Sequence, residues 1–145
     1  MKPDNRLPPV LLLLRLSVFV VMLFWTLDKF VRPAHTAKVY EGFYFIKGLG
    51  TSAAYTIGAL ELLILAGFLT GFRKKLTYGA VLLLHAISTV SSFKQYLTPF
   101  EGANLLFYAA WPMLAACFAL YSLRNLDTLC VIQAKESLSS ERSDK

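Results

Sequence analysis

Charged residues are scarce in this sequence, and their scarcity limits the class of protein it can encode. Only 17% of its 145 residues are charged, whereas 56% are hydrophobic and 14% are aromatic. A soluble domain of this size cannot bury so much apolar surface, because small domains have a high ratio of surface to volume. A lipid bilayer removes that difficulty. The composition therefore predicts an integral membrane protein.

Cysteine is also scarce, and reaction motifs are missing. The two cysteines, Cys117 and Cys130, form no C-x-x-C pair, which excludes a dithiol redox motif and a cysteine-based zinc site. No phosphate-binding loop or metal-ligand cluster is present, so we predict neither a catalytic residue nor a metal site, and the sequence requires no cofactor. The net charge of +6 does not indicate a nucleic-acid partner, because the basic residues lie mainly between and beside hydrophobic runs.

Long hydrophobic runs are what the sequence does contain. Each of four runs has about the ~20 residues needed to cross the hydrocarbon core of a bilayer. Inside lipid these runs must be helical, because only helices and closed barrels satisfy the backbone there. Short turns join the last three runs, so consecutive helices should be antiparallel neighbours. We therefore predict an all-α, four-helix up-down bundle in one domain, residues 1–133, with helices at about 8–30, 51–72, 76–97 and 103–123.

Two segments fall outside these runs. The connection at 31–50 carries apolar and aromatic residues at near-helical spacing, which fits either a short helix in the membrane interface or an ordered loop capping the bundle. The tail at 134–145 is polar and serine-rich, and we predict that it is disordered and cytoplasmic. The residues that set the spacing in the connection are Val39, Tyr40, Phe43, Tyr44 and Ile46.

The basic residues of the loops predict the orientation. With four crossings, nine Lys and Arg residues fall on the side of the two termini and five fall on the other side. The consecutive Arg73, Lys74 and Lys75 belong to the first group. Because cytoplasmic loops are enriched in Lys and Arg, both termini should be cytoplasmic.

Three ionisable residues lie well inside the predicted helices: Arg15, Glu61 and His85. Counted from the cytoplasmic helix ends, their depths are roughly 10, 16 and 14 Å at 1.5 Å per residue, so they can meet in one polar layer. Charged side chains at that depth need a partner or a function. The layer is either a proton-handling site, or an Arg15–Glu61 ion pair that joins two helices with His85 hydrogen-bonded beside it.

A polar stripe follows one face of the third predicted helix, and such a stripe should face the bundle interior. It lines a ligand cavity in one interpretation and supplies interhelical hydrogen bonds in the other. Small residues spaced four apart on the second helix, as in Ala54-x-x-x-Gly58, predict close helix packing. The stripe consists of Tyr78, His85, Ser88, Thr89, Ser92 and Gln95.

Several short pieces resemble the DoxX-like family of small bacterial membrane proteins. They are Arg15-Leu16 and Lys29-Phe30 of the first helix, and Gly58-Ala59-Leu60-Glu61-Leu62, Gly67 and Gly71-Phe72-Arg73 around the second. Such families have a glycine before the lysine, where this chain has Trp25. The resemblance implies a four-helix bundle of the bacterial inner membrane. It also implies an association with quinone- or thiol-linked redox systems.

Three functional hypotheses follow. The first is an accessory or assembly subunit of a membrane redox system, with a membrane-protein partner or as a homo-oligomer, and without catalytic activity of its own. The alternative is a binder or transporter of a small molecule, quinone or lipid, using the polar stripe. The third is an enzyme that uses Glu61 and His85 for proton transfer, but no sequence motif supports this hypothesis.

Overall fold

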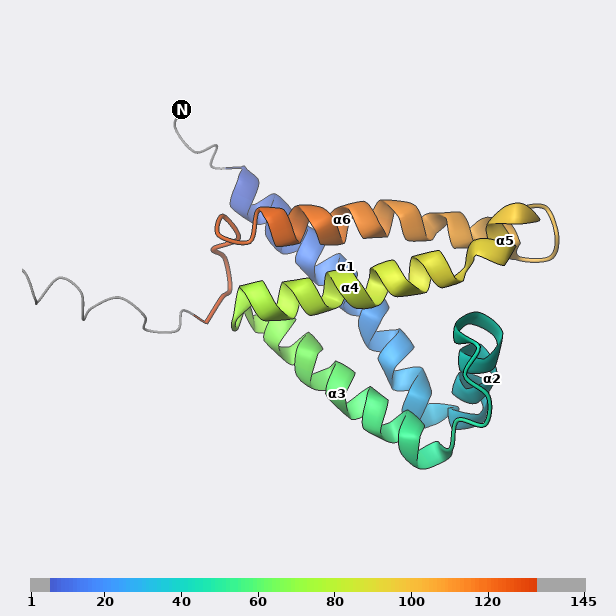
Figure 1. The fold of residues 1–145 in the computed structure, drawn as a ribbon. Helices are drawn as coiled ribbons and strands as arrows, with labels where there is room; N and C mark the ends of the chain where they lie inside the picture. Colours follow the sequence, from blue (N-terminus) through green and yellow to red (C-terminus); the bar gives the residue numbers. More distant parts are fainter. Residues whose placement is uncertain (1–5, 133–145) are drawn as a thin grey trace, which may run out of the picture.

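The computed structural model describes residues 6–132, and these fold into helices joined by turns. The predicted disordered tail at 134–145 lies outside the described residues. Figure 1 shows two long helix pairs that diverge from one end of the molecule. The elements in chain order are α1 (Leu7–Val31), α2 (Pro33–Tyr44), α3 (Thr51–Thr70), α4 (Lys74–Ser91), α5 (Phe93–Leu97), the 3₁₀ helix η1 (Asn104–Ala109) and α6 (Ala110–Ser122).

Three helical stretches are long and apolar enough to cross a membrane: α1, α3 and the continuous run of η1 and α6. The prediction of an all-helical membrane protein is therefore confirmed at this level, whereas four crossings are not. The predicted number of spans and the number of candidates differ because of the predicted third span. Helix α4 is only 18 residues long, begins with Lys74 and Lys75, and carries the polar stripe, so it is less apolar than the others.

Several helices end at other residues than predicted, because the local backbone conformation ends them there. Helix α3 stops at Thr70 because Gly71 adopts a left-handed conformation, φ +67°, which ends a helix most readily at glycine. The predicted third span breaks at Ser92, and α5 continues beyond it. The predicted fourth span begins as the 3₁₀ helix η1. Pro112 lies in the first turn of α6, where its missing N–H is tolerated.

The helices pack as two pairs, α1 with α3 and α4 with α6, and α1 also contacts α6. The turn between α3 and α4 joins the pairs at one end, and Figure 1 shows the two helices separating from there. The α1–α3 contact is close at Gly58, where the side-chain carbon of any larger residue would lie 2.6 Å from the ring of Phe30. This agrees with the close packing predicted from the small residues of α3.

Helix α2 occupies the wide end between the pairs. It contacts α1, α3 and α4, so the predicted connection is helical and also covers this end. Phe43 of α2 stacks on Phe107 of η1, with ring centroids 5.7 Å apart. We call this end the wedge end. The opposite end, which holds the start of α1, the α3–α4 turn and the end of α6, is the clamp end (Figure 1).

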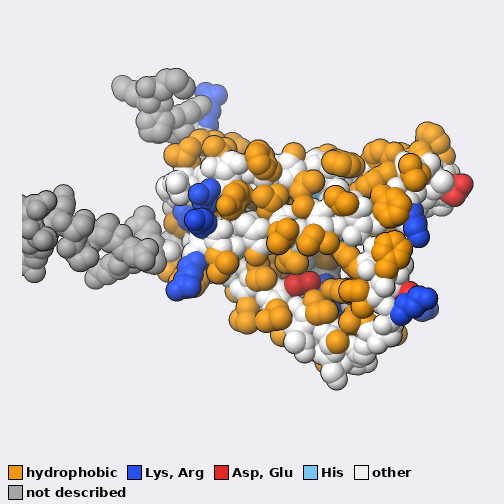
Figure 2. All heavy atoms as spheres, viewed as in Figure 1, with side chains coloured by type: hydrophobic (Ala, Val, Ile, Leu, Met, Phe, Trp, Pro, Cys, Tyr) orange, Lys and Arg blue, Asp and Glu red, His pale blue; other side chains and the backbone are white. Residues whose placement is uncertain are grey.

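Charged and hydrophobic side chains occupy different parts of the surface along the direction of the helices. In Figure 2, basic side chains gather toward the two ends, and hydrophobic side chains cover most of the face between them. A hydrophobic cluster fills the inside of the bundle, with contributions from every long helix. Its buried members are Leu11, Val18, Leu65, Phe68, Tyr78, Val81, Cys117 and Leu120.

Candidate functional site: two ion pairs inside the bundle

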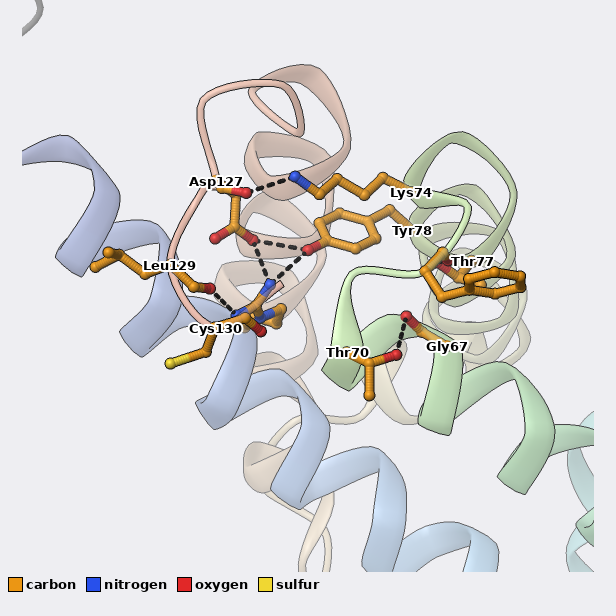
Figure 3. Close-up of polar contacts among 10 residues, drawn as sticks. Gly67, Thr70, Lys74, Thr77, Tyr78, Asp127, Leu129 and Cys130 are labelled. Atoms are coloured by element: carbon orange, nitrogen blue, oxygen red, sulfur yellow. Dashed lines mark hydrogen bonds and ion pairs between the residues drawn. The ribbon is translucent and has the colours of Figure 1, made fainter. Parts of the chain in front are cut away.

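Arg15 is fully buried at the clamp end and forms an ion pair with Asp127. Its Nη1 lies 3.2 Å from Oδ2 of Asp127, and both side chains have 0% exposure. The same Nη1 donates a hydrogen bond to the hydroxyl of Tyr78 at 3.1 Å, and that hydroxyl donates to Asp127 at 2.7 Å. Figure 3 shows Tyr78 and Asp127 reaching this point from opposite sides. The three side chains form a closed triangle of polar contacts, which we call the clamp.

The segment after α6, residues 123–132, folds back across the clamp end, and we call it the strap. Two of its carbonyls, at Leu129 and Cys130, accept hydrogen bonds from Nη2 of Arg15 at 2.6 and 3.3 Å. Lys74 of α4 donates to the carbonyl of Asp127 at 2.6 Å. The strap thereby connects α1 and α4 to the end of α6.

The strap also joins α3. The N–H of Ile132 donates to the carbonyl of Thr70 at 2.8 Å. Beside it, Val131 packs so closely on Gly71 that a side-chain carbon at Gly71 would lie 2.6 Å from Cγ1 of Val131. Gly71 is therefore required twice, for its positive φ and for this contact. All four long helices meet the strap or the clamp.

Two atoms of the clamp have no hydrogen-bond partner among the described residues, namely Nε of Arg15 and Oδ1 of Asp127. A buried charge with unsatisfied atoms is costly, and removing its partner is costlier still. Beside the strap, a surface cavity of about 400 Å³ opens against largely apolar side chains. It is lined by Leu12, Arg15, Leu16, Leu69, Thr70, Cys130, Val131 and Ile132.

Glu61 does not pair with Arg15, so the predicted Arg15–Glu61 pair is wrong. Oε2 of Glu61 lies 2.8 Å from Nζ of Lys29 and accepts a hydrogen bond from the hydroxyl of Thr26 at 3.0 Å. The physical reason is the antiparallel packing of α1 and α3. The end of α3, not its middle, lies level with Arg15, and Phe30 lies level with Gly58. The predicted polar layer is therefore two separate ion pairs.

The Lys29–Glu61 pair is less enclosed than the clamp, with side-chain exposures of 12% and 14%. Lys29 also donates to the carbonyl of Trp25 at 3.3 Å. Above the pair, Tyr40 of α2 is partly buried. Burial, together with the negative charge of Glu61, raises the pKa of Tyr40 to about 12. The charge of the Glu61 carboxylate thus affects the ionisation of a side chain on α2, the helix that covers the wedge end.

A third polar group fixes the corner between α1 and α2. The carboxylate of Asp28 accepts hydrogen bonds from Nε of Arg32 and from Nδ1 of His35, both at 2.6 Å. Arg32 is the single residue between α1 and α2, and Pro33 begins α2, so these contacts hold α2 at its angle to α1. All three side chains are partly solvent-exposed, and the contacts explain the geometry of the corner without a ligand.

His85 belongs to neither ion pair. Its Nε2 lies 3.1 Å from the carbonyl of Ala110 on α6, and because a carbonyl only accepts, the imidazole donates. His85 is buried, as are Tyr78, Thr89 and Ser92, so the stripe faces the interior as predicted. The hydroxyls of Thr89 and Ser92 donate to carbonyls of α4 itself.

The stripe therefore contributes mainly to packing between α4 and α6. Ser88 and Gln95, its remaining members, are half-buried, and Oε1 of Gln95 has no hydrogen-bond partner among the described residues. None of the predicted ligand-lining residues borders the cavity beside the strap. A ligand-lining role for Tyr78, Ser88, Thr89, Ser92 and Gln95 stays a prediction.

Sequence reasoning missed Asp127, the partner that Arg15 needs. One signal was available: Asp127 is the first carboxylate after the last hydrophobic run, and the predicted topology places it on the side from which Arg15 enters. A buried cation close to one membrane face calls for an anion from that face. The missing step was the strap, whose irregular turns give no periodic pattern.

Comparisons add no name to this geometry: no protein-family model, curated protein or solved structure matches the chain. Within residues 6–132 no group of three or more His, Cys, Asp or Glu side chains is placed to hold a metal ion. The fold and the two ion pairs define the class, an all-helical protein with three membrane-spanning candidates and polar contacts between its helices.

Proposed function

We propose that this protein is a four-span subunit of the bacterial inner membrane that supports the assembly of a quinone- or thiol-linked redox system. The observation that carries the proposal is the use of polar groups inside the bundle. The clamp and His85 direct their hydrogen bonds to other parts of the chain, which is the pattern of a scaffold that holds helices together. The resemblance to DoxX-like proteins supplies the link to redox systems.

Helix α4 is the fourth span in this proposal. Together with α5 it extends from Lys74 to Leu97, broken only at Ser92, which is long enough to reach across a bilayer. Its polar stripe is buried against the bundle, so the side chains left toward lipid are mainly apolar ones such as Leu83 and Val90. This arrangement explains why a true span can be less apolar than its neighbours.

The proposed orientation places the clamp end in the cytoplasm. Arg73, Lys74, Lys75 and Arg124 lie at this end, and basic residues near short loops favour the cytoplasmic side. Alkaline phosphatase fused after Lys145 should therefore be inactive in a bacterial host, and the same enzyme inserted after Gly48 should be active. The reversed pattern would overturn the orientation.

Partner capture tests the assembly role. We expect the tagged full-length chain, extracted from its native membrane in a mild detergent, to retain a membrane oxidoreductase or its assembly intermediate. Deleting the gene should lower the amount of that enzyme in the membrane. A chain that purifies without any redox protein, with the membrane oxidoreductases unchanged in the deletion strain, would refute the proposal.

A further inference from the structure

A hollow lies between the two helix pairs toward the wedge end. Helices α3 and α4 separate there, and Figure 2 shows acidic side-chain atoms within the hollow, bordered by hydrophobic side chains. The Lys29–Glu61 pair is the partly exposed ion pair on the α1–α3 side. A charged pair that remains open within an apolar surface is unusual, because such groups are normally enclosed.

The two ends of the hollow are covered. Helix α2 contacts α1, α3 and α4 at the wedge end, and the Phe43–Phe107 stack connects it to η1. At the clamp end, the strap and the α3–α4 turn close the bundle. Figure 2 shows the acidic atoms on the flank of the bundle and not at either end, so a molecule would reach them from the bilayer rather than from water.

The ion pair has unused hydrogen-bonding capacity. Oε2 of Glu61 accepts from Lys29 and from Thr26, whereas Oε1 has no partner among the described residues and is not sealed from the surface. The ammonium of Lys29 has three N–H donors and two acceptors, Glu61 and the carbonyl of Trp25. One acceptor and one donor remain for a ligand.

These features restrict the ligand. The pair carries no net charge, so it does not select a charged molecule. Glu61 is ten residues beyond the start of α3, roughly 15 Å along the helix, and it meets Lys29 in the last turn of α1. A charged headgroup gains no counter-charge from a neutral pair bordered by hydrophobic side chains, whereas a hydroxyl can both donate and accept.

We propose that the Lys29–Glu61 pair binds the hydroxyl group of an uncharged, membrane-dissolved lipid that enters between α3 and α4. The hydroxyl donates to the free oxygen of Glu61 and accepts from Lys29, while the apolar body lies against the hydrophobic border of the hollow. This inference goes beyond the assembly role and does not depend on any protein partner.

The test uses the full-length chain in phosphatidylcholine nanodiscs, with native mass spectrometry to count bound lipids. The first probe is dioleoylglycerol, and its matched control is the methyl ether of the same molecule, which accepts but cannot donate. We expect one bound dioleoylglycerol per chain, at an affinity about tenfold above that of the ether, which corresponds to one hydrogen bond to a charged group. Menaquinol-4 presents the same group on a ring, and whichever probe binds more tightly identifies the source of the hydroxyl.

Two variants locate the site. Glu61→Gln should lower the affinity for dioleoylglycerol about tenfold, whereas Glu101→Gln, an exposed carboxylate of the α5–η1 loop, should not change it. If Glu61→Gln does not fold, Lys29→Met/Glu61→Gln removes both charges together and replaces it in the assay. Equal binding of the alcohol and the ether, unchanged binding in the folded variants, or preferred binding of anionic phosphatidic acid would each overturn the proposal.

Discussion

The two ion pairs inside the bundle differ in burial and in the number of partners. Arg15 and Asp127 are both completely buried, and the clamp binds side chains or carbonyls from α1, α4 and the strap. Lys29 and Glu61 retain some exposure. Besides each other, their hydrogen-bond partners are only the hydroxyl of Thr26 and one backbone carbonyl of α1. Both pairs are opposite charges at contact distance, so their charges do not distinguish them.

The difference indicates which pair is structural and which is accessible. A fully enclosed pair that ties several chain segments together exposes no side-chain surface, and the loss of one partner leaves an uncompensated buried charge. A partly exposed pair with fewer partners contributes less to stability than a fully enclosed one. The clamp therefore governs folding, and the wedge-end pair is the place for binding.

Breaking the clamp should have the largest effect. Arg15→Ala or Asp127→Asn leaves a buried charge without its partner, and we expect each to lower the free energy of unfolding by about 3–5 kcal/mol. Unfolding by dodecyl sulfate in mixed micelles measures this change.

The double-mutant cycle sharpens the same prediction. Arg15→Met/Asp127→Leu should lose clearly less than the sum of the losses in Arg15→Met alone and Asp127→Leu alone, because no charge remains unpaired in the double variant. Arg15→Met combined with Glu61→Gln should be additive, since these side chains belong to different ion pairs. Strong coupling between Arg15 and Glu61 would restore the pairing that the structure rejects.

The contact between the strap and α3 ranks second. Gly71→Ala forces a left-handed backbone onto an L-residue and places a methyl group 2.6 Å from Val131. We expect a loss of about 2–4 kcal/mol, as the sum of the strain and the overpacking. Gly102→Ala is the matched control, because Gly102 also has a positive φ, +53°, but nothing lies within 4 Å of the new carbon. Equal losses at the two glycines would mean that the strap does not press on α3.

Sequence reasoning reached the helices more reliably than their partners. Hydrophobic runs located all four long helical stretches, because lipid imposes helices on any such run. The residues that stop those runs, Gly71 and Ser92, act through local conformation, which hydropathy does not report. The inward stripe of α4 followed from helical periodicity alone.

Pairing required information that one sequence does not hold. Arg15, Glu61 and His85 were placed in one layer by counting residues from helix ends, but a count cannot show how far α1 is shifted along α3. A shift of a few turns decides whether Glu61 meets Arg15 or Lys29. Asp127 was hidden because an irregular strap leaves no period to recognise.

The wedge-end pair should matter less for stability than the clamp. Glu61→Gln should lower the free energy of unfolding by about 1 kcal/mol, because Glu61 and Lys29 are partly exposed and Lys29 keeps the carbonyl of Trp25. The same unfolding assay applies, with Asp127→Asn measured beside it. A loss at Glu61 as large as that at Asp127 would remove the distinction between the two pairs.

A smaller effect is expected at high pH through Tyr40. Its pKa in the folded protein is about 12, above the ordinary value of 10.0, because the uncharged form is favoured where Tyr40 is buried near Glu61. A raised pKa contributes stability that is fully present below pH 10 and is lost as the pH rises toward 12. Ultraviolet difference titrations of the unchanged protein and of Tyr40→Phe should differ by one late-titrating tyrosine. A tyrosine titration unchanged by that substitution would place α2 elsewhere.

His85→Gln should show the smallest effect of all, and the neighbours of His85 explain why. The imidazole donates one hydrogen bond to the carbonyl of Ala110 and touches neither ion pair. A glutamine amide can replace that donor, so His85→Gln should change the free energy of unfolding by less than about 1 kcal/mol, whereas His85→Leu, which has no donor, should lose about 1 kcal/mol more. The two variants separate a packing role from a chemical one, because an amide cannot titrate. If His85→Gln is stable but no longer retains its partner or lipid, the imidazole handles a proton or a ligand, and the polar stripe of α4 joins the wedge-end pair as a functional site.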